Sequence, residues 1–239
     1  MLYIYIHGFN SGYSPDGYKV AALKKIGAVD GVQYDSFGSY DIVCESIHHQ
    51  LCDILKQDGG MSGHSARAES PEGVRTQSEA GDRADSTSNK MAASIAGDKA
   101  GFCLVGTSLG GFWASIFGNR LGIPAVLINP TIKPYISLKR YVGRKLPNFV
   151  TREKNRLDAG VPGTYSDIEA SGNFLVLLDM GDQVLDYRAA FDWFEGQNVI
   201  SFEGGSHRFD HMEESLPHIK KFAENFPYFT TTMRRTSVS

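Results

Sequence analysis

Short apolar runs alternate with segments of helical periodicity along most of the chain. Six runs predict strands, at residues 3–6, 32–37, 102–105, 125–129, 174–178 and 198–202. Apolar residues at helical spacing follow or separate them, at 17–27, 40–56, 109–121 and 187–194. A last helix carries Leu216, Ile219, Phe222 and Phe226 on one face, with Ser215 as its N-cap and Pro217 in its first turn. This alternation predicts an α/β fold with about six mostly parallel strands flanked by helices.

Three segments depart from this pattern. Residues 58–98 are polar, and the stretch 61–90 contains no Leu, Ile, Phe, Tyr or Trp. Too little apolar area is available there to offset the entropy of ordering the backbone, so we expect a disordered surface insertion. Residues 131–171 lie between the fourth and fifth predicted strands, where we expect a small cap. The polar end at 230–239 is expected to be a flexible tail, which leaves one domain at 1–229.

A candidate nucleophile lies in the sequence Gly-Thr-Ser-Leu-Gly at 106–110, directly after an apolar run. The pattern G-x-S-x-G between a strand and a helix is typical of a nucleophile elbow, a turn so tight that it exposes the serine hydroxyl. Glycines two residues before and after Ser108 remove the Cβ atoms that would collide in such a turn. We therefore expect Ser108 to act as a nucleophile, the alternative being a buried serine in a glycine-rich turn.

A candidate acid and a candidate base follow the serine in chain order. Asp182 comes just after the strand predicted at 174–178, and His207 comes after the last predicted strand through Gly-Gly-Ser. Nucleophile, acid and histidine in this order match the α/β-hydrolase triad, in which the histidine activates the serine hydroxyl and the acid fixes the imidazole tautomer. The alternatives are Asp186 for the acid and His211 for the base. Because the carboxyl ends of parallel strands share one edge of a sheet, all these residues are expected on that edge.

The loop after the first predicted strand, His-Gly-Phe-Asn-Ser at 7–11, is expected to complete the site. Acyl transfer needs two backbone N–H groups that stabilise the developing oxyanion. We expect these N–H groups from Leu109, at the start of a helix, and from Phe9. His7 is expected to brace this loop, the alternative being that it acts as a base.

These motifs together resemble the YqiA/YcfP-like esterases, small bacterial α/β-hydrolases, and the match is closer to the YqiA branch. The resemblance rests on residues 7–11, 106–111, 129–130, 181–188 and 203–207, and it extends over nearly all of the chain outside the insertion and the tail. It implies an α/β-hydrolase fold and an esterase or thioesterase that acts on small-molecule acyl esters, with Ser108, Asp182 and His207 as its catalytic triad. The long polar insertion and Thr107, where a serine is common, depart from the family pattern.

Composition narrows the class of protein further. A net charge of −3 gives no reason to expect nucleic acid as a partner, and no apolar segment is long enough for stable insertion in a membrane. The three cysteines form no CxxC or Cys/His cluster, so no metal is expected, and the apolar start of the chain lacks the features of a signal peptide. We therefore expect a cytoplasmic hydrolase that needs no cofactor. The alternatives are an acyltransferase with the same triad and a non-catalytic ligand-binding protein that retains the fold.

The expected cap is unusually basic for a chain of negative net charge. Between residues 133 and 156 it holds eight Lys and Arg residues and one acidic residue, Glu153, with aromatic and aliphatic side chains interleaved. Such a surface can contact an acyl chain while its cations hold an anionic leaving group. The candidate substrate contacts are Tyr135, Arg140, Tyr141 and Arg144. The alternative is a solvated surface whose charges serve only solubility.

Overall fold

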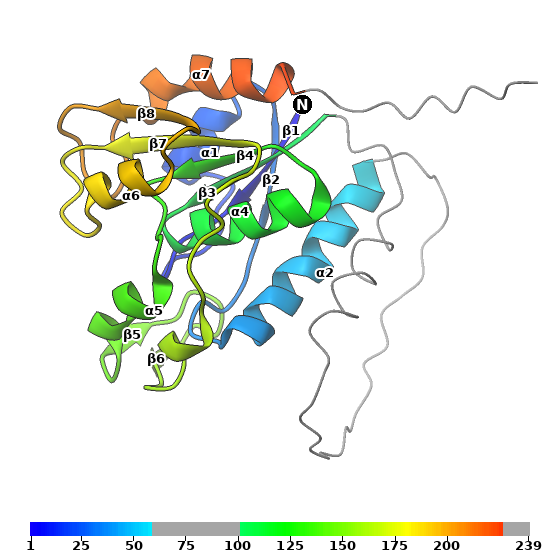
Figure 1. Cartoon of the computed structure of the whole chain (residues 1–239). Helices are drawn as coiled ribbons and strands as arrows, with labels where there is room; N and C mark the ends of the chain where they lie inside the picture. Colours follow the sequence, from blue (N-terminus) through cyan, green and yellow to red (C-terminus); the bar gives the residue numbers. More distant parts are fainter. Residues whose placement is uncertain (59–100, 227–239) are drawn as a thin grey trace, which may run out of the picture.

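The computed structural model describes residues 1–58 and 101–226, and its centre is a six-stranded parallel sheet (Figure 1). The strands lie in the order β2-β1-β3-β4-β7-β8. Their bounds are β1 (Leu2–Ile6), β2 (Ala28–Val32), β3 (Phe102–Thr107), β4 (Ala125–Ile128), β7 (Phe174–Asp179) and β8 (Asn198–Phe202). The predicted α/β fold is confirmed. The chain direction across the sheet changes between the neighbours β1 and β3, and ligands of open α/β sheets bind beyond the carboxyl ends of strands at such a point.

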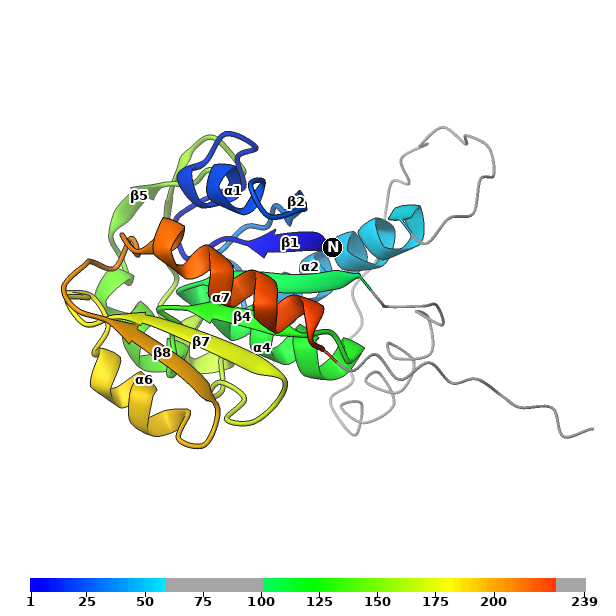
Figure 2. The ribbon, with the colours of Figure 1, turned by 90° about the horizontal axis from the view of Figure 1, so that it is seen from above.

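Helices cover both faces of the sheet (Figures 1 and 2). One face carries α1 (Tyr18–Leu23) and α7 (Met212–Glu224), and the other carries α2 (Tyr40–Asp58), α4 (Leu109–Leu121) and α6 (Tyr187–Trp193). Successive strand residues point to opposite faces, so β1 sends Ile4 and Ile6 into one hydrophobic cluster and Tyr3 and Tyr5 into the other. The inner strands β1, β3, β4 and β7 are therefore buried almost throughout, as parallel strands covered on both faces require, whereas the edge strands β2 and β8 include polar residues such as Asp30 and Asn198.

The predicted cap at 131–171 has secondary structure of its own. It contains the short helix α5 (Pro134–Ser137), the 3₁₀ helices η1 (Leu138–Tyr141) and η2 (Pro162–Thr164), and an antiparallel hairpin of β5 (Lys145–Pro147) and β6 (Lys154–Arg156). Figure 1 shows α5 and the hairpin together below the main sheet. The buried cap residues Leu138, Leu157, Tyr165 and Ile168 belong to the same hydrophobic cluster as α2 and α4, so the segment packs on the main core.

The second strand was predicted at 32–37, and this prediction is wrong: β2 is Ala28–Val32. The residues after Val32 leave the sheet because a side chain forms the hydrogen bonds that a neighbouring strand would otherwise make. The main chain of Gln33 is bonded on both sides to the Gln50 side chain of α2, which accepts from the Gln33 N–H and donates to its carbonyl. The Tyr34 ring stacks on His7 at 4.2 Å between ring centroids, so the apolar residues of this segment are buried under the loop after β1.

The start of the last helix was also predicted wrongly. The helix begins at Met212 with His211 as its N-cap residue, so Ser215 and Pro217 lie inside it. The Ser215 hydroxyl donates to the Met212 carbonyl within the helix and caps nothing. Proline is tolerated at 217 because the hydrogen bond it removes would end on Glu213, in the exposed first turn.

The other predicted elements are present, and their ends differ from the predicted ones by at most four residues. The insertion expected at 58–98 falls almost wholly outside the described residues, and so does the tail expected at 230–239. Among the helices of residues 1–58 and 101–226, none has the length and apolar character needed to cross a bilayer.

The main-chain path from β3 into α4 passes extremely close to β1. A Cβ atom at Gly110 would lie 2.0 Å from the Ile6 carbonyl oxygen, and one at Gly106 would lie 2.0 Å from the Gly110 carbonyl oxygen. Backbone atoms cannot yield to such an overlap as a flexible side chain can. The two outer glycines of the G-x-S-x-G pattern are therefore required by packing.

We expect Gly110→Ala to lower the free energy of unfolding by at least about 3 kcal/mol, because the new methyl group overlaps the β1 backbone. Gly163→Ala is the matched control, since a Cβ there meets no atom within 4 Å. Urea unfolding of both variants measures the effect. Equal midpoints for the two variants would contradict the close approach of α4 to β1.

Candidate active site

Ser108 occupies a strained turn between β3 and α4. Its backbone has φ 56° and ψ −119°, in a left-handed region that a serine adopts at a cost of about 1–3 kcal/mol. The Ser108 N–H donates to the Ile128 carbonyl of the neighbouring strand, and the Ser108 carbonyl accepts from the N–H groups of Gly111 and Thr131. The predicted tight turn is confirmed. Its backbone is fixed on both sides, so the Ser108 side chain leaves the strand at the carboxyl edge of the sheet.

The side chains of Ser108, His207 and Asp182 form one hydrogen-bonded series. His207 Nε2 lies 3.1 Å from Ser108 Oγ, and His207 Nδ1 lies 2.7 Å from Asp182 Oδ2. The Asp182 side chain is 2% exposed and that of His207 is 24% exposed. With Nδ1–H donated to the carboxylate, Nε2 is free to accept the serine proton. The structure thus brings together three residues separated by up to 99 positions in the chain.

Asp182 is held in place by its own turn. Its second carboxylate oxygen, Oδ1, accepts from the N–H groups of Val184 at 2.7 Å and Leu185 at 2.9 Å. Asp186, the alternative acid, is instead the N-cap of α6, where its Oδ1 accepts from the Arg188 N–H at 3.0 Å. The geometry therefore distinguishes the two carboxylates, and only Asp182 bonds to His207.

A second carboxylate–imidazole pair lies directly beneath the His207 loop. Asp179, at the end of β7, is fully buried, and its Oδ1 lies 2.7 Å from His211 Nδ1. Its Oδ2 accepts from the N–H groups of Ser206 at 3.0 Å and Asp210 at 2.7 Å. Asn129 links the same parts, because it accepts from the Asp179 N–H and donates to the Ser206 carbonyl. His211, the alternative base, thus belongs to a network that fixes the residue before His207.

The loop after β1 lies against the turn that carries Ser108. A Cβ at Gly8 would be 3.1 Å from the Thr107 carbonyl oxygen and 3.2 Å from the Ser108 Cβ. Within the parts of the chain that the structure describes, the N–H groups of Phe9 and Leu109 have no protein acceptor. Both are thus available for a ligand, although their role as oxyanion donors stays a prediction.

His7 braces the loop after β1, as expected from the sequence. Its Nδ1 bonds to the Gly8 carbonyl at 2.9 Å, its Nε2 accepts from the Tyr34 N–H at 3.3 Å, and the Tyr34 hydroxyl donates to the His7 carbonyl at 2.6 Å. Burial lowers the pKa of His7 to about 4, because charging the imidazole there would require its desolvation. His7 is therefore neutral near pH 7, with both ring nitrogens engaged.

The four expected cap contacts divide into two pairs. The Tyr141 ring packs on Phe9 with 4.8 Å between centroids, and the Arg140 guanidinium donates to the Val184 carbonyl at 2.9 Å. These two residues join the cap to the loops around Ser108 and Asp182. Tyr135 instead bonds to Asp167 within the cap, and the guanidinium of Arg144 has no partner in residues 1–58 and 101–226.

One neighbour of the serine escaped the sequence analysis. Thr131 Oγ1 lies 3.4 Å from Ser108 Oγ, and the Thr131 N–H donates to the Ser108 carbonyl. The signal was its position just after the strand beside β3, on the same edge of the sheet. Predicting that the Thr131 hydroxyl lies beside Ser108 would have needed the strand order, which the sequence pattern left open.

A family model described as "Uncharacterised protein family (UPF0227)" matches residues 74–224, more than half of the chain. The chain belongs to this family. The matched range includes Ser108, Asp182 and His207 and ends before the last residues of the described chain, while the loop after β1 lies outside it.

Two curated UPF0227 proteins are similar in sequence. That of Shewanella woodyi is 28% identical over 130 residues, which cover 50% of this chain and 63% of the relative. That of Shewanella sediminis is 31% identical over 123 residues, which cover 51% of this chain and 64% of the relative. The similarity therefore spans somewhat less than two thirds of these relatives.

Solved structures of α/β hydrolases share the fold. Est1E from Butyrivibrio proteoclasticus has a TM-score of 0.56 at 14% identity, covering 92% of this chain and 86% of its own. A Xanthomonas campestris protein described as a member of the a/b serine hydrolases without lid has a TM-score of 0.51 at 17% identity, covering 95% and 84%. At such identities the likeness shows the α/β-hydrolase fold of this chain.

We expect His7 to make stability depend on pH. Unfolded His7 takes up a proton below its ordinary pKa of 6.5, whereas folded His7 does so only near 4. The contribution of neutral His7 to the free energy of unfolding is thus complete above pH 6.5. It falls by about 1.4 kcal/mol per pH unit as the pH drops toward 4, because only the unfolded state gains the proton. Urea unfolding of the wild type and His7→Gln across this range measures it, because slopes from other groups cancel in the difference. A stability difference that does not change with pH would contradict this account of His7.

Proposed function

We propose that the protein is a serine hydrolase that cleaves small-molecule carboxylic esters or thioesters through an acyl-enzyme on Ser108. The observation that carries the proposal is the hydrogen-bonded series from Asp182 through His207 to Ser108 Oγ. It lies at the carboxyl edge of a parallel sheet, on a strained turn that packing against β1 and backbone hydrogen bonds to Ile128 and Thr131 maintain. The membership of UPF0227, the α/β-hydrolase fold and the resemblance to the YqiA branch of esterases support the same chemistry.

The first half of the reaction forms the acyl-enzyme. Ser108 Oγ attacks the substrate carbonyl while His207 Nε2 takes the hydroxyl proton, which needs a heavy-atom distance of the kind observed, 3.1 Å. Asp182 keeps the proton of His207 on Nδ1 and stabilises the imidazolium that forms. His207 then gives its proton to the leaving alcohol or thiol as the carbon–oxygen or carbon–sulfur bond breaks.

The negative charge that develops on the carbonyl oxygen needs donors placed before the reaction begins. We assign this role to the backbone N–H groups of Phe9, in the loop after β1, and of Leu109, the first residue of α4. Removing one such donor in comparable enzymes slows turnover by about 10²–10³. The contact of Gly8 with the Ser108 turn supports this assignment, since it brings the next N–H of the loop beside the nucleophile.

Water completes the cycle. His207, neutral again, removes a proton from a water molecule that attacks the acyl carbonyl, and the serine leaves as its oxygen regains that proton. The His207 ring is one-quarter exposed, so water reaches it from the open side of the site. These steps use the residues named, the substrate and water.

We expect Ser108→Ala to abolish hydrolysis of 4-nitrophenyl acetate and butyrate while the protein stays folded. Turnover should fall by roughly 10⁴–10⁶, as in comparable triad variants. A fluorophosphonate should add covalently to the wild type and not to the variant, which the mass of the intact protein measures. A folded variant that keeps more than a tenth of the activity, or that still takes up the probe, would contradict the proposal.

We expect Asp182→Asn to lower turnover by roughly 10⁴, because an amide cannot hold the required imidazole tautomer. Asp186→Asn is the matched control. Asparagine is as good an N-cap as aspartate, so turnover should change by no more than about twofold. Initial rates of ester hydrolysis compare the two variants at equal protein concentration. Similar losses in both would remove the distinction between the two carboxylates.

A further inference from the structure

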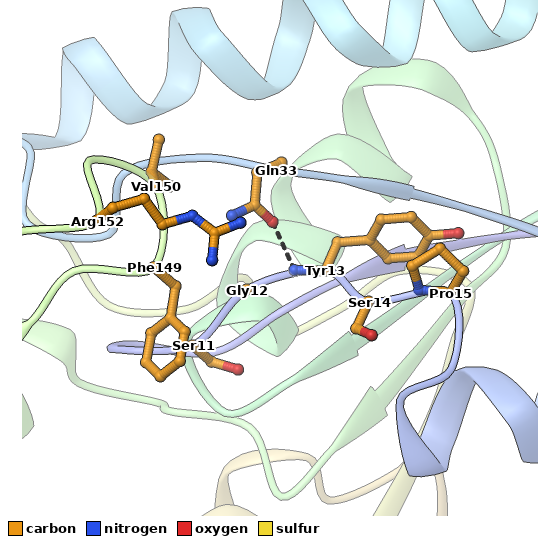
Figure 3. Close-up of a pocket in the computed structure, with 9 residues that line it drawn as sticks. All are labelled: Ser11, Gly12, Tyr13, Ser14, Pro15, Gln33, Phe149, Val150 and Arg152. Carbon is orange, nitrogen blue, oxygen red and sulfur yellow. Dashed lines mark hydrogen bonds between the residues drawn. The ribbon is translucent and has the colours of Figure 1, made fainter.

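A cavity of about 700 Å³ opens beside the segment 11–15, away from the residues proposed for catalysis. Its walls are this segment, Gln33 after β2, and the turn 149–152 of the β5–β6 hairpin. Neither Ser108 nor His207 lines it. Figure 3 shows the side chains of Phe149 and Arg152 extending from the hairpin turn toward the segment 11–15.

The polar groups of the cavity are hydrogen-bond donors. Gln33 Oε1 accepts from the Tyr13 N–H at 2.5 Å, drawn in Figure 3, so its NH₂ group remains for a ligand. Gly12 lies beneath that amide, since a Cβ there would be 3.0 Å from Gln33 Nε2. Ser11 and Ser14 add two hydroxyl groups, and no Asp or Glu lines the cavity.

Arg152 supplies the charge. In residues 1–58 and 101–226 its guanidinium forms no ion pair, and its five N–H groups remain available. Asp35 Oδ1 accepts from the Phe37 N–H and from the Asn148 side chain, and Asp35 forms no ion pair with Arg152 in the described residues. An unpaired guanidinium beside amide and hydroxyl donors is complementary to a carboxylate or phosphate, which it binds through two parallel hydrogen bonds.

The hairpin turn that carries Arg152 is built firmly. Asn148 is buried, and its Oδ1 accepts from the N–H groups of Val150 and Thr151 while its Nδ2 donates to Asp35. Arg152 itself has a left-handed φ of 65°, which a non-glycine residue keeps only in a fixed backbone. A fixed turn lowers the entropy lost when the arginine binds a ligand.

The same turn exposes apolar surface to the cavity. Phe149 is 45% exposed and Val150 39%, and the Tyr13 ring lies on the opposite wall. Large apolar side chains left open to solvent beside polar donors are typical of small-molecule sites. The ligand that fits therefore combines an anionic group with an apolar or aromatic one.

We propose that this cavity binds a small molecule with a carboxylate or phosphate group carried on an aromatic or short apolar body. Arg152 and the Gln33 amide hold the anion, and Phe149 and Tyr13 contact the apolar part. Ser11 is two residues from Phe9, so the ligand is either the distal end of an extended ester substrate or a separate effector. The recognition chemistry is the same for both sources.

Isothermal titration of Ser108→Ala with phenyl phosphate tests the binding, independently of any hydrolysis. We expect saturable binding that Arg152→Gln weakens about ten- to a hundredfold. Gln33→Glu should weaken it as much, because glutamate keeps the acceptor for Tyr13 and replaces the donor by a negative charge. Arg188→Gln, which changes an exposed arginine on α6 outside the cavity, should leave the affinity unchanged, and neutral phenol should not bind.

A lack of saturable binding, or equal affinity in Arg152→Gln and Arg188→Gln, would overturn the proposal. Steady-state kinetics of the enzyme with Ser108 intact then identify the source of the anion. If Arg152→Gln raises KM for an ester with a distal carboxylate and not for 4-nitrophenyl acetate, the site belongs to the substrate. Unchanged KM for both esters, together with lost phenyl phosphate binding, assigns it to a separate effector.

Discussion

The close approach of α4 to β1 is the constraint on which the rest of the molecule depends. At Gly110 the helix backbone lies against the carbonyls of Ile6 and His7, and at Gly106 the strand lies against the helix. Two glycines therefore allow β3 to turn into α4 within one residue. That residue, Ser108, takes the strained conformation that the turn imposes. The energy of packing along the sheet offsets this strain. The position of the Ser108 hydroxyl is therefore fixed by the packing of the core around the turn.

A buried carboxylate organises the opposite side of the site. The carboxyl ends of β7 and β8 carry the loops with Asp182 and His207, and Asp179 binds three groups of the second loop. Because Asp179 is fully buried, leaving these donors unpaired would be costly, which makes the arrangement rigid. The molecule thus uses one Asp–His pair to hold the backbone and a neighbouring one to meet the serine. Preorganisation of this kind is what catalysis by a serine–histidine pair requires.

The cap connects these loops to the anion-binding cavity proposed above. Its residues reach the site at Phe9 through Tyr141 and at Val184 through Arg140. Its hairpin reaches the loop after β2 at Asp35 through Asn148. The segment between β1 and α1 therefore has the Ser108 turn near its beginning and the cavity farther along it. Two surfaces with different chemistry share one short stretch of chain, and this arrangement allows an extended ligand or an effector to act on the loop after β1.

Local patterns were sufficient for five of the six strands, most helices and the three residues that meet at the edge of the sheet. Residues of the inner strands are apolar because both faces are buried, and G-x-S-x-G identifies its turn because only glycine fits there. Long-range contacts decided the rest. Residues 33–37 left the sheet because the Gln50 side chain satisfies the Gln33 backbone. The last helix begins four residues earlier than predicted because His211, its N-cap residue, is held by Asp179. The position of Thr131 beside Ser108 depends on strand order, and the position of Arg152 in the wall of the cavity depends on cap packing. Such contacts join residues distant in the chain, and no periodicity within a segment records them.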